Sequence, residues 1–149
     1  MRELLFRGQT RKHGEKVHAI TGEKIPGNWV YGGIFQGQNQ SIIYGYDPVE
    51  KYVVHSDTVG QYTGMPDKAG NKAFEHDCIR ELYGDSIGVI RFGEYRNPFD
   101  GYGPSHVGFY VDWVSSSGKD AYRKDLGYWL NRVEVIGNIH DNPELLKGE

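Results

Sequence analysis

Short apolar runs separated by polar, glycine-containing turns follow one another along this chain. The second half holds four such runs: Cys78–Leu82, Ile87–Phe92, Val107–Trp113 and Arg132–Ile139. In the first half, Ser41–Tyr46 and Lys51–His55 flank a Tyr-Asp-Pro sequence that is typical of a turn. Runs of this length between turn residues are typical of β-strands. The pattern predicts a chain of short strands that includes a hairpin over residues 41–55.

The segments between these runs are more polar. Residues 61–73 contain Gly64, Pro66 and Gly70, so we expect turns there rather than a regular element. Residues 114–131 are the best helix candidate, although Gly127 weakens it. The sequence ends in a tail in which Pro143 begins a short helix, with Asn142 as its predicted N-cap.

Composition supports a β-rich domain. The chain has 149 residues, of which 21 are Gly and 11 are Tyr, and 38% are hydrophobic. Glycine is roughly twice as frequent as in an average protein, which favours strands and tight turns over helix bundles. A chain of this length fits one domain, or two small modules that share a core.

Charge and cysteine content restrict the setting. The net charge of −3 gives no global attraction to nucleic acid or anionic membranes. A single cysteine, Cys78, excludes an intramolecular disulfide and fits a reducing compartment. No apolar run approaches the roughly 20 residues of a membrane helix. We therefore expect a soluble protein of the host-cell cytoplasm with no membrane partner.

Two longer segments resemble a known family. QYTGMPDKAGNKAFEHDCI covers residues 61–79 and VEVIGNIHDNPELL covers residues 133–146, and together they are similar to the YopX-like proteins of phages and prophages. Two positions depart from the family pattern. His76 stands where Gly is expected, and Cys78 stands where Ile or Val is expected. Because His adopts positive φ less easily than Gly, His76 makes it uncertain that the family's backbone turn is kept at that position.

The resemblance implies an α+β, mainly β fold. An irregular N-terminal α/β subdomain, residues 1–73, would precede a C-terminal SH3-like β-barrel with a docking tail, residues 74–146, in one compact unit. The succession of strands after residue 77 also looks like such a barrel. The resemblance further implies a phage or prophage origin and assembly into a homo-oligomer, and it implies no catalytic residue and no cofactor.

The chain contains residue types that bind metals or act as nucleophiles, but their spacing does not fit such sites. An EF-hand loop starting at Asp67 fails, because Ala69 and Cys78 occupy ligand positions. Instead, we expect Asp67 to bond its own turn and Gly70 to be left-handed. His76 and Cys78 lack the further clustered ligands that zinc needs. Cys78 is followed by an apolar run, which argues against an activated nucleophile. We predict no catalytic and no metal site.

Aromatic side chains are the remaining candidates for a functional surface. We predict a binding surface formed by these residues: Arg91, Tyr95, Arg96, Phe99 and Tyr102. Aromatic and arginine side chains on small β-domains bind bases or proline-rich peptides. We expect a non-catalytic oligomeric binding or scaffolding protein whose partner is unknown. The alternative is a nucleic-acid-binding module in phage replication or gene regulation.

Overall fold

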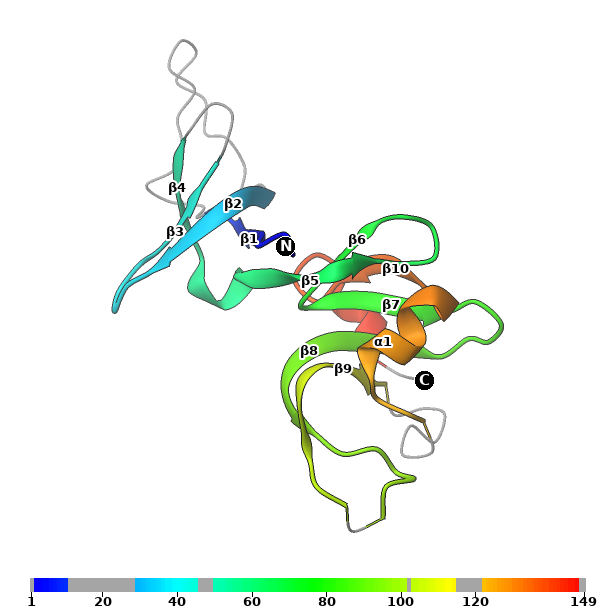
Figure 1. The fold of residues 1–149 in the computed structure, drawn as a ribbon. Coiled ribbons are helices and arrows are strands. Elements are labelled where there is room, and N and C mark those ends of the chain that lie inside the picture. Colours follow the sequence, from blue (N-terminus) through cyan, green and yellow to red (C-terminus); the bar gives the residue numbers. More distant parts are fainter. Residues whose placement is uncertain (1, 11–28, 46–49, 102, 115–121, 148–149) are drawn as a thin grey trace. The chain divides into compact units, whose positions relative to one another are not determined.

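A computed structural model gives the architecture of the chain (Figure 1). It describes residues 2–10, 29–45, 50–101, 103–114 and 122–147. Three predictions therefore fall outside the described residues. They concern the turn at residues 46–48, residues 115–121 of the predicted helix, and Tyr102. The chain groups into two compact units, Met1–Tyr62 and Thr63–Glu149.

The first unit contains most of a six-stranded sheet with the strand order β4-β3-β2-β1-β5-β6, in which β5 runs across the boundary at Tyr62. Its strands are β1 (Phe6–Gln9), β2 (Trp29–Gln36), β3 (Ser41–Tyr44), β4 (Lys51–Val54) and β5 (Gly60–Pro66). The predicted hairpin is confirmed, because Ser41 pairs with Val54 and Tyr44 pairs with Lys51. The apolar side chains buried in this unit are Leu5, Ile42, Ile43, Val54 and Tyr62.

Strand β5 corrects the expectation of turns throughout residues 61–73. Its first residues pair with β1, where Gln61 lies opposite Phe6. The amide of Tyr62 also donates to the carbonyl of Leu5 at 2.8 Å. These backbone bonds to a distant strand outweigh the weak strand propensity of the local sequence. Gly64 remains in the strand with φ 90°, a conformation that favours glycine.

The second unit is built on a four-stranded antiparallel sheet with the order β10-β7-β8-β9. The strands are β7 (Asp77–Glu81), β8 (Ile87–Tyr95), β9 (His106–Trp113) and β10 (Val133–Asn138). They match the four apolar runs, so this part of the prediction is confirmed. A further short strand, β6 (Lys72–Phe74), precedes them and neighbours the end of β5. The mainly β character of the fold is likewise confirmed.

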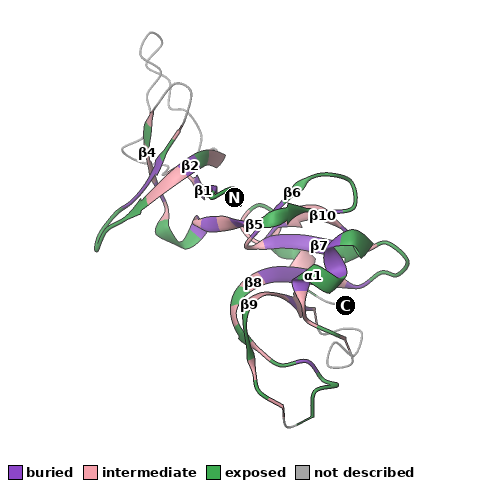
Figure 2. Ribbon diagram, viewed as in Figure 1, coloured by how far each residue is buried: buried purple, intermediate pink, exposed green. Residues whose placement is uncertain are grey.

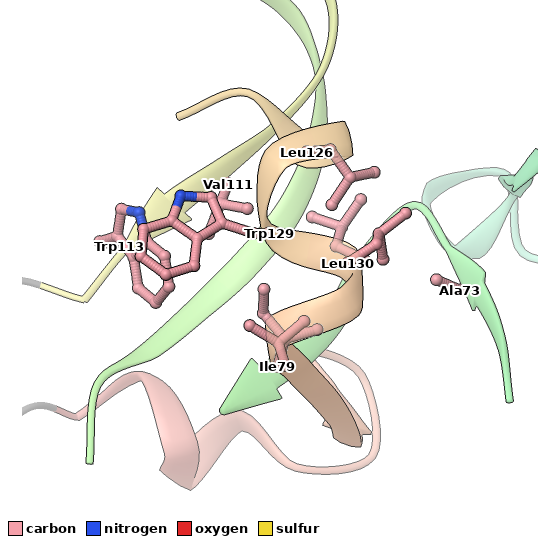
Figure 3. Close-up of a cluster of buried hydrophobic side chains, with 9 residues drawn as sticks. Ala73, Ile79, Val111, Trp113, Leu126, Trp129 and Leu130 are labelled. Carbon is pink, nitrogen blue, oxygen red and sulfur yellow. The ribbon is translucent and has the colours of Figure 1, made fainter. Parts of the chain in front are cut away.

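One face of this sheet carries the core of the second unit (Figure 3). The cluster combines residues of the strands with residues of the short helix α1 (Leu126–Trp129) and the 3-10 helix Leu130–Arg132. Its members are Ala73, Ile79, Ile90, Val111, Trp113, Leu126, Trp129, Leu130 and Val133. Trp113 of β9 and Trp129 of α1 meet edge to face, with ring centroids 4.9 Å apart. The predicted helix over 114–131 is thus reduced, within its described part, to one turn of α-helix and one of 3-10 helix.

The expected SH3-like barrel is not confirmed. In the described part of the chain, β10 and β9 are the two ends of an open sheet. The outer edge of β9 is covered near its end by irregular backbone, because the Val111 amide donates to the Lys124 carbonyl at 2.8 Å. The β10 edge receives a similar cover, because the Lys68 amide donates to the Val133 carbonyl at 3.2 Å. Irregular segments therefore protect the edges of this open sheet. In a closed barrel the two edge strands would pair with each other instead.

Candidate functional site

The first signature segment forms a turn that is fixed by the Asp67 carboxylate. One oxygen of Asp67 accepts hydrogen bonds from the amides of Ala69 (2.9 Å) and Asn71 (2.8 Å). The other oxygen accepts a bond from the amide of Val135 in β10 at 2.8 Å. Gly70 has φ 90°. The predicted turn is confirmed, and its added bond to β10 gives this carboxylate a structural role.

The second signature segment forms a turn around Asn138. The Asn138 side-chain oxygen accepts bonds from the amides of His140 (3.0 Å) and Asp141 (2.9 Å). Asn142 occupies the predicted N-cap position of the 3-10 helix Pro143–Leu146, but its side chain makes no capping hydrogen bond there. Its side-chain oxygen instead accepts a bond from the Asn138 amide at 3.2 Å. Polar side chains of both signature segments therefore hold turns at the ends of β10.

The structure places His76 beside His140 and buries Cys78. His76 Nδ1 and His140 Nε2 lie 3.4 Å apart, and Glu75 reaches the other nitrogen of His76 at 3.6 Å. No group of three or more potential ligands able to hold a metal occurs in the described portion of the chain. Cys78 is fully buried, and burial, together with the charge of Asp77, raises the pKa of its thiol to about 11. A thiol with this pKa stays protonated and unreactive near neutral pH.

The outer half of the β8–β9 hairpin, residues 91–95 and 106–110, is here named the hairpin arm. Figure 2 shows that the hairpin becomes largely exposed toward its far end. Phe92 lies opposite Phe109, and Glu94 lies opposite Val107. These pairs share the sheet face of the buried pair Ile90 and Val111, because side chains alternate along a strand. Phe92 is nevertheless 56% exposed and Val107 is 75% exposed.

The opposite face of the hairpin arm carries Tyr95 in a stack of rings. Tyr95 lies between His106 and Tyr110, with ring centroids 5.3 Å and 5.2 Å away. Its hydroxyl donates to the Asp125 carboxylate at 2.5 Å. Burial, followed by this bond to a carboxylate, raises the pKa of Tyr95 to about 12.

Asp125 is the centre of a small polar network. It accepts hydrogen bonds from Tyr95, from Asn97 Nδ2 at 3.1 Å and from Arg123 Nε at 2.8 Å. Burial acts to raise the pKa of Asp125, but the three donors outweigh burial and lower it. Asn97 in turn accepts the Lys124 amide at 2.8 Å. The network ties the loop after β8 to the segment before α1.

A pocket lies between these two segments. It has a volume of about 300 Å³ and is lined by Phe99 from the hairpin loop and by Tyr122, Arg123, Tyr128 and Trp129 from the segment around α1. The indole N–H groups of Trp113 and Trp129 both donate to the Arg123 carbonyl, at 3.1 Å and 2.6 Å. These bonds fix the Trp129 ring at the pocket wall. Phe99 is 74% exposed and Tyr128 is 44% exposed.

The residues of the predicted binding surface do not all meet in this pocket. Arg91 forms an ion pair with Asp112 at 3.0 Å on the strands. Arg96 donates to the Gly103 carbonyl at 3.0 Å within the hairpin loop. Phe99 lines the pocket, Tyr95 supports the network beside it, and Tyr102 lies outside the described residues.

Sequence reasoning overlooked the other wall of the pocket. Tyr122, Tyr128 and Trp129 lie in the predicted helix over residues 114–131 and do not belong to the predicted binding surface. A signal was present, since three large aromatic residues and Arg123 occur within residues 122–129 of an otherwise polar segment.

The fold and the pocket together define a β-rich protein of two antiparallel sheets with an aromatic pocket beside its longest hairpin. The sequence model of the family described as YopX protein matches residues 30–147, and the chain therefore belongs to the YopX family. Comparison with curated proteins gives no match. Within the described residues, no helix has the length and apolar character needed to cross a membrane.

Proposed function

We propose that this YopX family protein is a non-catalytic scaffolding protein that works as a homo-oligomer in a phage- or prophage-carrying host cell. The observation that carries the proposal is the apolar face of the hairpin arm. Phe92 and Val107 extend the face of the buried core onto the surface, where both are more than half exposed. Exposed apolar residues that continue a core are typical of surfaces that bind another protein.

The backbone of the hairpin arm supports self-association as well. In the described residues, β9 is the last strand of its sheet, and the irregular segment before α1 pairs with its backbone at Tyr110 and Val111. Residues 106–109 therefore offer an edge to which a second strand can add. A second copy of the hairpin arm would supply both a strand and a matching apolar face, as a symmetric dimer interface requires.

The chemistry near the hairpin arm supports a binding role rather than catalysis. Its polar side chains are held in pairs, such as Arg91 with Asp112 at 3.0 Å and His106 with Asp100 at 3.1 Å. The buried Cys78 thiol is protonated at neutral pH. The hairpin arm therefore acts as a subunit interface, and none of the described residues is assigned a chemical reaction.

Light scattering on the size-exclusion peak tests this proposal. We expect the unaltered protein to form a discrete oligomer, and we expect the double variant Phe92→Ser/Val107→Ser to elute with a smaller mass. Both side chains are largely exposed, so circular dichroism should show a folded variant. Burying a phenylalanine contributes roughly 2 kcal/mol, and each interface would lose at least two such side chains.

The matched control is Tyr83→Ser, because Tyr83 is 95% exposed in the turn between β7 and β8, away from the hairpin arm. This variant should keep the mass of the unaltered protein. A monomeric unaltered protein over a wide concentration range, or a double variant with unchanged mass, would contradict the proposal.

A further inference from the structure

We propose that the pocket around Phe99 and Tyr128 binds an unpaired base of single-stranded nucleic acid, while the arginines beside it contact the phosphates. The proposal is independent of the oligomer. It gives the sequence-based alternative of a nucleic-acid-binding module a definite site.

The pocket walls suit a flat aromatic group. Tyr128 and Trp129 meet edge to face with centroids 5.1 Å apart, so their rings form two sides of a corner. Phe99 comes from the facing loop, and it has no ring partner among the residues that the structure describes. Its exposed ring is therefore available for stacking. Bases stack on such side chains whatever their identity, because every base has a π-face.

The size of the pocket restricts the ligand. A volume of about 300 Å³ lies at the lower end of the range of small-molecule sites. It suits a single ring system better than a large cofactor. A base in an intact duplex is stacked and paired on all sides, and it cannot enter such a pocket unless it leaves the stack. The pocket therefore favours single strands.

Local charge favours an anionic ligand. The Arg132 guanidinium lies 4.3 Å from the ring centre of Tyr128, and that of Arg123 lies 5.5 Å from it. Arg96 lies in the same loop as Phe99. The nearby Asp125 carboxylate is engaged by Tyr95, Asn97 and Arg123. Although the whole chain has a net charge of −3, residues 96–101 and 122–132, which flank the pocket, carry four Lys/Arg against the two carboxylates of Asp100 and Asp125.

The same arginines argue against the other ligands that aromatic pockets take. A quaternary ammonium group would be repelled by guanidinium groups this close to the rings. A proline-rich peptide is recognised by an elongated aromatic groove, and its backbone has no negative charges that could pair with a cluster of arginines. A nucleic-acid strand uses both features, since its bases stack while its phosphates pair with arginine.

Fluorescence anisotropy with a fluorescein-labelled 15-nucleotide oligothymidylate tests the proposal on the full chain. We expect binding at low salt that weakens as salt is raised. Phe99→Ala should weaken binding about tenfold, the size of effect typical of one lost stacking side chain. Because Phe99 is exposed, this variant should fold, and a thermal melt verifies that. Arg132→Gln should reduce the slope of log affinity against log salt concentration by about one, which corresponds to one released counterion fewer.

The control variant is Tyr83→Ala, which removes an exposed aromatic ring that does not line the pocket and should bind like the unaltered protein. Three results would overturn the proposal: no binding of the oligonucleotide, equal binding by Phe99→Ala, or equal affinity for a duplex of the same length. Binding of a labelled proline-rich decapeptide in place of the oligonucleotide would also overturn it. None of these results alters the mass measurement that tests the oligomer.

Discussion

His76 is the one non-glycine residue of the described chain with a left-handed backbone, at φ 77°. The backbone is held there from both sides, because the His76 amide donates to the Ile90 carbonyl at 2.7 Å and its carbonyl accepts the Ile139 amide at 3.1 Å. The turn that the family pattern assigns to glycine is thus kept by histidine. The imidazole packs edge to face on His140, with centroids 5.3 Å apart.

A pair of variants separates backbone strain from side-chain packing at His76. His76→Ala removes the imidazole but keeps a Cβ in the left-handed region, whereas His76→Gly removes both. We expect His76→Gly to be more stable than His76→Ala by about 1 kcal/mol in the free energy of unfolding, the usual cost of a left-handed non-glycine residue. Urea unfolding measures the difference. Equal midpoints would show that the turn is not strained.

Tyr95 predicts a pH dependence of stability. Its pKa is raised from the ordinary 10.0 to about 12 in the folded protein, so the folded state holds this proton more tightly than the unfolded state. The stabilisation is complete below pH 10 and is lost as the pH rises through 12. Urea midpoints at pH 9, 10 and 11 should fall more steeply for the unaltered protein than for Tyr95→Phe.

The control for this measurement is Tyr83→Phe, which should follow the unaltered protein because its ring is exposed. Parallel curves for Tyr95→Phe and the unaltered protein would mean that the bond from Tyr95 to Asp125 contributes nothing to the dependence.

At the scale of elements, the two edges of the β10-β7-β8-β9 sheet are covered by segments that are not strands. The Asp67 turn covers β10, and the segment before α1 covers the end of β9. Asp67 is 5% exposed and accepts bonds from Ala69, Asn71 and Val135. Its carboxylate is therefore the connection between the first signature segment and β10.

Asp67→Ala should destabilise the protein by about 3 kcal/mol, because three amide donors would lose a charged acceptor and the change occurs in a buried site. Hydrogen exchange should show the largest loss of protection at Val135. Asp85→Ala provides the control, since Asp85 is exposed in the turn before β8. A similar loss of stability in both variants would argue against the anchoring role of Asp67.

The sequence allowed the strands to be predicted where the apolar pattern is local. The four runs of the second unit became β7 to β10, and the hairpin of β3 and β4 was foreseen. Elements that depend on distant partners were not foreseen. Residues 60–66 form a strand because β1 supplies hydrogen bonds. The edges of the β10-β7-β8-β9 sheet are covered by backbone hydrogen bonds from Lys68 and to Lys124, which are distant in sequence.

At the scale of the whole molecule, the candidate site was likewise predictable where it depends on the local sequence and not where it depends on distant contacts. Phe99 could be selected from sequence because it lies in a loop rich in aromatic residues. Tyr122, Tyr128 and Trp129 could not be placed beside it, because the Asp125 network that brings the two segments together is a long-range feature. The signature segments were recognisable in sequence, whereas their structural role at β10 needed the fold.

The position of β10 in the sheet has a consequence for synthesis of the chain on the ribosome. β7 is an inner strand, yet one of its partners is made only after β8, β9 and α1. Until residues 133–138 leave the ribosome, the nascent chain carries an unpaired β7 edge, and both the Asp67 carboxylate and Ile79 lack their partner Val135. The second unit can therefore complete its fold only after residues 133–138 have left the ribosome, and translation products shortened before β10 would expose a strand edge that the folded protein covers.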